Sequence, residues 1–185
     1  CCWIAHLGHR FICFHEKYWY KTIVEDIAKD ILEIDKALGV TRVIDTCCDP
    51  TIDIKTGADI YTMKDKFELG GVPMTTSINS REHYAAAIHS ALGEEAEPGV
   101  PRFQIYTDGN RKGCPYLSKT LPLQRFDPDH PLRLADHPDD HPTVSVAYFL
   151  ISSGALEYKQ AFGSSKPKPW MIEKKDKSFL GNESV

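Results

Sequence analysis

The order of its apolar segments constrains the fold of this chain more than any other feature. Residues 3–20 contain two segments rich in aromatic and β-branched side chains that meet at Gly8, which is typical of two consecutive strands. Segments with helical periodicity then alternate with short apolar runs of strand length. This order predicts an α/β domain with a mixed sheet and helices on both of its faces.

The clearest helix is predicted over residues 22–39. Thr22 and Glu25 fit a capping box, isoleucines recur at helical spacing, and Gly39 supplies a C-terminal stop. The pattern also predicts strands at 41–48, 72–77 and 102–107, and a polar connection at 94–101. Further helices are predicted at about 57–69 and at 80–92, the latter behind a capping box of Asn79 and Glu82. Two more are predicted at 115–126, with a break near Pro122, and at 143–156, where a strand is the alternative.

The composition of the 185 residues fits one folded domain at 1–156, followed by a basic tail at 157–185. A net charge of -4 gives no general reason to bind nucleic acid, so DNA binding would need a local basic surface. No run is long and apolar enough to span a membrane, so no membrane partner is expected. Because the chain opens with Cys1, we expect it to be a piece of a longer protein.

The six cysteines form neither a C-x-x-C metal motif nor a spaced disulfide framework. We therefore expect free thiols in a reducing cytosol, several of them buried in strands. The sequence also contains no P-loop, which argues against ATP hydrolysis by that machinery.

Asp49 is the first candidate for chemistry. It follows a predicted strand and precedes Pro50, and ligands of open α/β sheets collect beyond the carboxyl ends of strands. Asp45 lies four residues earlier, on the same face if that segment is extended. Both carboxylates could hold a cation. The alternative is that Asp49 initiates an Asx turn.

A second acidic stretch precedes the last predicted helix. Asp139, Asp140 and His141 offer carboxylate and imidazole ligands suited to magnesium, manganese or zinc. The alternative role for Asp140 is a helix N-cap. Basic residues that could contact DNA phosphates lie in a turn and in the tail: Arg111, Lys112, Lys166, Lys168, Lys174 and Lys175.

Several stretches in a consistent order resemble the C-terminal nuclease domain of the terminase large subunit of tailed phages or prophages. The stretch "RVIDTCCDPTI" resembles the family's strand followed by an Asp-Pro or Asp-Ser step, and "DDHPTVSVAYFLIS" is similar to its final Asp-His helix. The segments "FICFHEKYWYKTIVEDIAKDI", "GGVPMTTSINSREHYAAAIHSALG" and "RFQIYTDGNRKGCPYLSKTLPLQRFD" resemble the parts between. The resemblance covers most of residues 3–155.

This resemblance implies a ribonuclease H-like fold and metal-dependent cleavage of concatemeric double-stranded DNA. Two Mg²⁺ or Mn²⁺ ions about 4 Å apart would activate a water and stabilise the leaving oxygen. Asp49 matches the carboxylate after the second catalytic strand, and Asp140 with His141 matches the start of the final helix. Expected partners are the portal protein, the small terminase subunit and an N-terminal ATPase domain, at the procapsid portal in the host cytoplasm.

Two departures from the family pattern predict a weakened site. Val144 stands where many members carry a further aspartate, so Asp140 or Asp139 would have to replace it. The strand that carries the family's first catalytic aspartate, expected before the two opening strands, is missing. We therefore expect poor metal binding and slow or no cleavage. The alternatives are a non-catalytic docking module of the packaging motor, through portal or DNA binding, and another ribonuclease H-like nuclease or recombinase.

Overall fold

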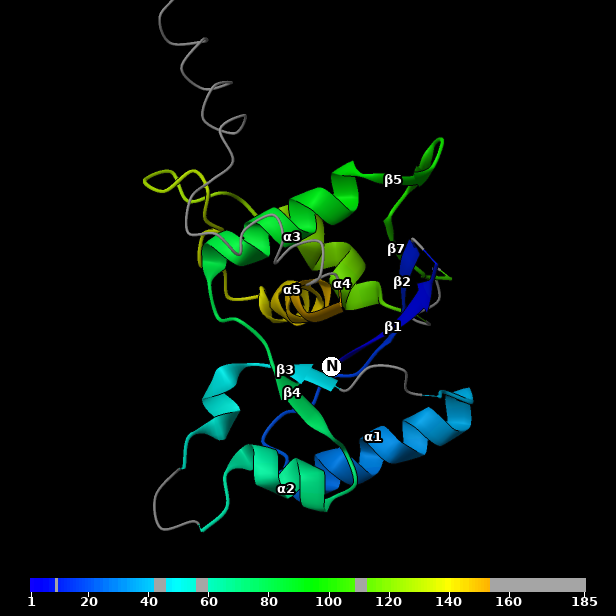
Figure 1. Cartoon of the computed structure of the whole chain (residues 1–185), viewed down its shortest axis with the longest axis vertical. Coiled ribbons are helices and arrows are strands. Elements are labelled where there is room, and N and C mark those ends of the chain that lie inside the picture. The colour runs from blue at the N-terminus through cyan, green and yellow to red at the C-terminus, as the bar shows by residue number, and fades with distance from the viewer. Residues whose placement is uncertain (9, 42–45, 56–59, 109–112, 154–185) are drawn as a thin grey trace, which may run out of the picture.

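The computed structural model describes residues 1–8, 10–41, 46–55, 60–108 and 113–153. In this part of the chain, helices pack around several small sheets, so the predicted α/β class with mixed strand directions is confirmed (Figure 1). Of the predicted site residues, Asp45, Arg111 and Lys112 lie outside the described residues. So do the four tail lysines and the predicted tail itself.

The first sheet has the order β1-β2-β7. Strands β1 (Cys2–Leu7) and β2 (Arg10–Glu16) are antiparallel, as the two opening segments predict. Gly8 follows β1 with a φ of 62°, a backbone conformation that glycine adopts without steric cost. Strand β7 (Phe103–Ile105) pairs with β2 in parallel.

The second sheet consists of the parallel strands β3 (Thr46–Cys48) and β4 (Met74–Thr76). The chain passes between them through the 3₁₀ turn η1 (Pro50–Asp53) and helix α2 (Met63–Leu69). Parallel neighbours need such a crossover, because a tight hairpin can join only antiparallel strands. Both carboxyl ends of this strand pair therefore point to the same edge.

Helix α1 (Val24–Leu38) ends at Gly39 in the left-handed conformation, as predicted, but its predicted capping box is wrong. Ile23 is the N-cap residue and makes no side-chain cap bond, whereas the Thr22 hydroxyl donates to the Tyr20 carbonyl at 3.2 Å. The start of α1 lies one residue later than a Thr22 cap requires. Packing of its apolar face thus outweighs local capping.

The next two helices also begin differently from the prediction. Helix α2 begins at Met63 behind a capping box of Thr62 and Asp65, which the sequence analysis missed. Helix α3 (Arg81–Gly93) has Ser80 as its N-cap, and the Ser80 hydroxyl accepts the His83 N–H. Asn79 is not the cap, because its side-chain amide bonds elsewhere, as described below.

The polar connection expected at 94–101 instead forms a small hairpin of β5 (Glu95–Glu97) and β6 (Val100–Pro101). Helix α4 (Pro115–Thr120) runs into the 3₁₀ turn η2 (Leu121–Leu123), close to the break predicted at Pro122. Helix α5 (His141–Ser153) confirms the predicted helix, rather than the strand alternative, for the last apolar segment.

Strands β1 and β3 lie in one layer between two helical layers. Cys2 and Ile4 of β1 and Cys47 of β3 pack against the core that includes α3, α4 and α5. Trp3, between Cys2 and Ile4, and Cys48, directly after Cys47, pack instead against the core that includes α1. Alternate side chains of both strands thus face opposite helical layers.

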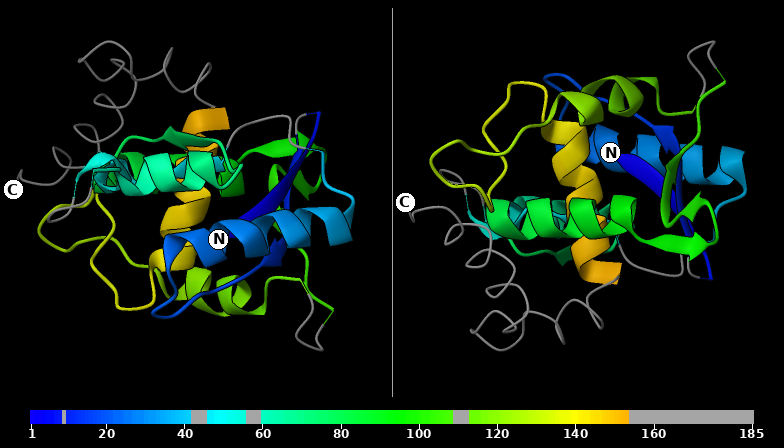
Figure 2. Two further views of the ribbon diagram at one scale, coloured as in Figure 1. Left: turned by 90° about the horizontal axis from the view of Figure 1, so that it is seen from below. Right: turned by 90° about the horizontal axis from the view of Figure 1, so that it is seen from above.

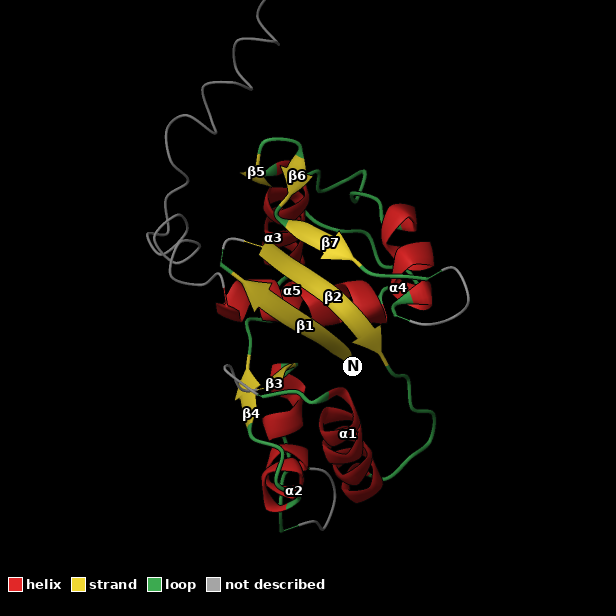
Figure 3. Cartoon of the chain, turned by 90° about the vertical axis from the view of Figure 1, so that its right-hand side faces the viewer, coloured by secondary structure: helices red, strands yellow, loops and turns green. Residues whose placement is uncertain are grey.

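The figures show the same arrangement of layers. In Figure 1 the strand pair β3–β4 lies between α5 above and α1 with α2 below. Figure 2 shows α1, in blue, crossing the direction of α5, in yellow and orange. Among the described residues no strand ladder joins β1 to β3, and Figure 3 shows their two sheets as separate pieces. The layer is therefore interrupted between β1 and β3.

Candidate active site

Asp49 lies directly after β3, at the edge where β3 and β4 both end. Asn79 follows β4 and reaches the same edge. Tyr148 arrives from α5, which packs across β3. Three segments far apart in the sequence thus converge on one carboxylate.

The Asp49 carboxylate accepts three hydrogen bonds. The Thr51 backbone N–H donates at 2.7 Å, the Asn79 amide at 3.3 Å, and the Tyr148 hydroxyl donates to the same oxygen as Asn79. The bond from Thr51 makes Asp49 the N-cap of η1, so the Asx-turn alternative is realised. This turn does not exclude a functional role, since every donor is neutral and the side chain is only half-buried.

A second tyrosine extends this network into the core. The Tyr84 hydroxyl of α3 donates to the Asn79 amide oxygen at 2.6 Å and lies 3.1 Å from the Tyr148 hydroxyl. The two rings meet edge to face, with centroids 5.4 Å apart. Tyr84 is 1% exposed and Tyr148 is 6% exposed, so their rings fix the geometry around Asp49.

The network sets the protonation states at its centre. Partial burial raises the pKa of Asp49, but the hydrogen bonds from Tyr148 and Thr51 outweigh burial and leave that pKa below its usual value. Burial, together with the hydrogen bond to Asp49, raises the pKa of Tyr148. At neutral pH the pair is therefore a carboxylate and a phenol.

Asp140 lies in a different environment at the start of α5. It is 6% exposed, and its carboxylate pairs with the Arg81 guanidinium at 2.6 Å. Arg81 also contacts Asp136 at 2.7 Å, so one cation of α3 holds two carboxylates. His141 is exposed, with its ring nitrogen 3.9 Å from Asp140.

Asp139 points to a third location. The Tyr116 hydroxyl at α4 donates to the Asp139 carboxylate at 2.7 Å. Asp139 and Asp140 are thus adjacent in the sequence but bind different elements.

The structure does not bring the two predicted halves of the metal site together. Asp49 is held by Thr51, Asn79 and Tyr148, whereas Asp140 is paired with Arg81. Within the described ranges, no group of three or more His, Cys, Asp or Glu side chains could hold a metal ion. These residues therefore do not by themselves fit a site for two ions about 4 Å apart.

Sequence reasoning missed the two tyrosines of the Asp49 network and the role of Glu16. Tyr84 and Tyr148 lie on helices among small apolar residues, where the pattern indicates only core packing. The sequence also gives no sign of the role of Glu16, whose carboxylate accepts the N–H groups of Tyr116 at 2.5 Å and Leu117 at 2.9 Å. These links join residues 100 or more positions apart, which local patterns do not reveal.

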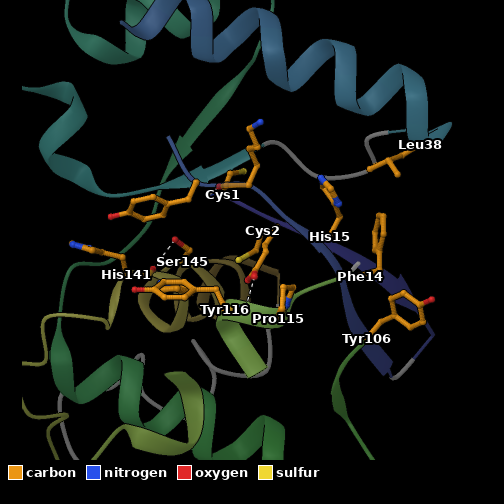
Figure 4. Close-up of a pocket in the computed structure, with 15 residues that line it drawn as sticks. Cys1, Cys2, Phe14, His15, Leu38, Tyr106, Pro115, Tyr116, His141 and Ser145 are labelled. Carbon is orange, nitrogen blue, oxygen red and sulfur yellow. Dashed lines mark hydrogen bonds between the residues drawn. The ribbon is translucent and has the colours of Figure 1, made fainter. Parts of the chain in front are cut away.

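A cavity of about 610 Å³ opens beside the first sheet. Figure 4 shows the Cys2 side chain in the middle of its lining, between those of Ser145 and His15. The cavity is bordered by β1, the end of β2 and the starts of α4 and α5. Asp49 and Asp140 are not among the residues that line it.

Comparisons of the chain with protein-family models, with curated proteins and with solved structures gave no match. Among the described residues, no helix has the length and apolar character needed to cross a membrane.

Proposed function

We propose that this chain is a ribonuclease H-like domain of a DNA-packaging terminase large subunit, with Asp49 as a catalytic carboxylate. The observation that carries the proposal is the position of Asp49: an ionised side chain at the carboxyl ends of two parallel strands, where ligands of α/β sheets bind. Under this proposal the domain cuts concatemeric double-stranded DNA at the procapsid portal, in the host cytoplasm. The portal protein, the small subunit and an ATPase domain are its partners.

The interruption of the sheet supports this proposal. Strands β1 and β3 share one layer, contact α5 from the same side, and have no ladder between them among the described residues. We propose that a further strand pairs there and carries the family's first catalytic aspartate. Such a strand would run next to β3 and so bring a second carboxylate toward Asp49.

For this domain to bind Mg²⁺ or Mn²⁺ as proposed, it would need carboxylate ligands in addition to those that the structure describes. Asp49 and Asn79 offer oxygen ligands suited to these hard cations. Asp140 is paired with Arg81, and neither Asp139 nor His141 points toward Asp49 in the contacts observed. When bound, the ions would supply Lewis-acid activation of water and phosphate. Asp49 would hold and orient them.

A nicking assay tests the role of Asp49. Full-length protein would be incubated with supercoiled plasmid and Mn²⁺, and the relaxed product measured over time. We expect Asp49→Asn to slow nicking by more than about 100-fold, since loss of mere outer-shell partners of a metal already costs 10–100-fold. The matched control is Asp53→Asn, because Asp53 lies in the same 3₁₀ turn and pairs only loosely with Lys64, at 3.8 Å. Equal nicking by the wild type and Asp49→Asn would refute the proposal.

A non-catalytic docking module is the second candidate, and the internal pairing of the acidic residues favours it. Three neutral donors satisfy Asp49, and Arg81 satisfies Asp140. If the domain only docks, Asp49→Asn changes neither nicking nor binding to portal protein and DNA. A recombinase, the third candidate, is disfavoured because recombinases usually place a glutamate within the last helix, and α5 contains no acidic residue.

A further inference from the structure

Two buried cysteines meet in the core between the first sheet and α4. The sulfur atoms of Cys13 on β2 and Cys114 at the start of α4 are 3.3 Å apart, and both residues are 0% exposed. Neither is in a disulfide. A disulfide needs about 2.05 Å between the sulfurs, so they would have to approach by only about 1.3 Å.

The backbone holds these two cysteines in register. The Tyr106 N–H donates to the Cys13 carbonyl at 2.8 Å, and the Cys114 N–H donates to the Tyr106 carbonyl at 2.9 Å. The Glu16 carboxylate ties the end of β2 to the first turn of α4 through the N–H groups of Tyr116 and Leu117. The contact between the sulfurs is therefore fixed from both sides.

A third thiol connects this pair to the cavity. Cys2 is half-buried and lines the cavity (Figure 4). It also packs against the cluster that contains Cys13 and Cys114. A hydrogen bond with Cys13 lowers the pKa of the Cys2 thiol, although burial opposes this. Cys2 is thus the accessible member of a row of three thiols.

We propose that Cys13 and Cys114 form a redox-sensitive disulfide pair, with Cys2 as the residue that first reacts with a peroxide entering the cavity. The inference rests on the arrangement and environment of the three thiols and is independent of the proposed nuclease function. In a reducing compartment all three residues stay thiols. Under oxidation the disulfide joins β2 to α4.

The reaction sequence is balanced with hydrogen peroxide as the oxidant. Cys2 first loses its thiol proton, and the thiolate attacks one peroxide oxygen. The O–O bond breaks, a sulfenic acid forms, and the departing hydroxide takes up the proton lost by Cys2 and leaves as water. The Cys13 sulfur then attacks the Cys2 sulfur and displaces the hydroxyl group, which leaves as water with the Cys13 proton. Cys114 attacks Cys13 in turn, and the released Cys2 thiolate takes up the Cys114 proton. One peroxide becomes two waters as two thiols become one disulfide.

Peptide mapping after oxidation tests this inference. The full chain would be treated with hydrogen peroxide under native conditions, alkylated and digested. We expect a cross-linked peptide that contains Cys13 and Cys114, and a fall in free thiols from the six of the chain to four. Because the cross-link spans 101 positions, it should raise Tm by on the order of 10 °C. Dithiothreitol should reverse both effects.

Three single variants separate the steps. Cys114→Ala should accumulate the Cys2–Cys13 disulfide, and Cys2→Ala should slow the Cys13–Cys114 cross-link by at least about tenfold. Cys48→Ala is the matched control, because Cys48 is half-buried and burial raises its pKa to about 12, yet it belongs to the other core cluster. Recovery of Cys13 as a free thiol after Cys2 is oxidised would overturn the proposal. So would an unchanged rate in Cys2→Ala.

Discussion

Tyr148→Phe isolates the interaction that most defines the Asp49 site. The substitution removes one hydroxyl from a residue that is 6% exposed and leaves the ring packing intact. A hydrogen bond to a charged group contributes about 1.5–3 kcal/mol, and partial exposure of Asp49 puts the expected loss at the lower end. We therefore expect the free energy of unfolding to fall by about 1–2 kcal/mol at pH 7, measured by urea denaturation.

The pH dependence of this loss follows from the direction of two pKa shifts. The pKa of Asp49 is lowered in the folded state, so its stabilising contribution is present above about pH 4 and is lost as the pH falls further. The pKa of Tyr148 is raised, so its contribution is present below about pH 10 and is lost as the pH rises. The difference in the free energy of unfolding between wild type and Tyr148→Phe should therefore become smaller at both low and high pH.

Tyr116→Phe is the matched control for this measurement. Its hydroxyl also donates to a carboxylate, that of Asp139, but on the surface, where water competes for both groups and the hydrogen bond adds little stability. The reasoning would be refuted if Tyr148→Phe and Tyr116→Phe lost equal stability at pH 7. If the loss of unfolding free energy in Tyr148→Phe were the same at pH 3 and pH 7, the lowered pKa assigned to Asp49 would be refuted.

Two further pairs of substitutions test the structure elsewhere by the same denaturation assay. Arg81→Met leaves the buried Asp140 carboxylate uncompensated and should cost about 2–4 kcal/mol, whereas Lys29→Met breaks an exposed pair and should cost under about 0.5 kcal/mol. Gly113→Ala, at a φ of 80° with its new Cβ 2.3 Å from a backbone oxygen, should cost more than about 2 kcal/mol. Gly99→Ala, at a φ of 76° in open space, should cost about 1 kcal/mol. Equal costs within either pair would contradict the contacts described.

The parts of the fold that the sequence predicted are those set by local periodicity. The opening strand pair, the Gly39 stop and the helical character of α5 all depend on residues within a few positions of each other. The errors lie at helix starts, where several hydroxyl and amide side chains compete for one role. Asn79 was a reasonable cap for α3, but the fold uses it to bridge Asp49 and Tyr84, and Ser80 caps instead.

The candidate site was predicted only in part, for a related reason. Asp49 could be recognised from its position after a strand and before Pro50. Its partner Tyr148 is 99 residues away, and no spacing rule connects them. Likewise, the sequence presents Asp139, Asp140 and His141 as one ligand cluster. The structure instead pairs Asp139 with Tyr116 and Asp140 with Arg81, and leaves His141 exposed, 3.9 Å from Asp140.

Asp49 and Asp140, the two aspartates predicted as site residues, differ in what a cation would have to displace. At Asp49 an ion would replace hydrogen bonds from neutral groups, Tyr148 and Asn79, on a side chain that water already reaches. At Asp140 it would have to displace the Arg81 guanidinium from a buried carboxylate and leave that positive charge beside the incoming ion. The second exchange is far costlier, because a buried pair that loses one member leaves the other uncompensated. Metal affinity of this domain should therefore depend on Asp49 and be insensitive to Asp140 for as long as the pair with Arg81 persists.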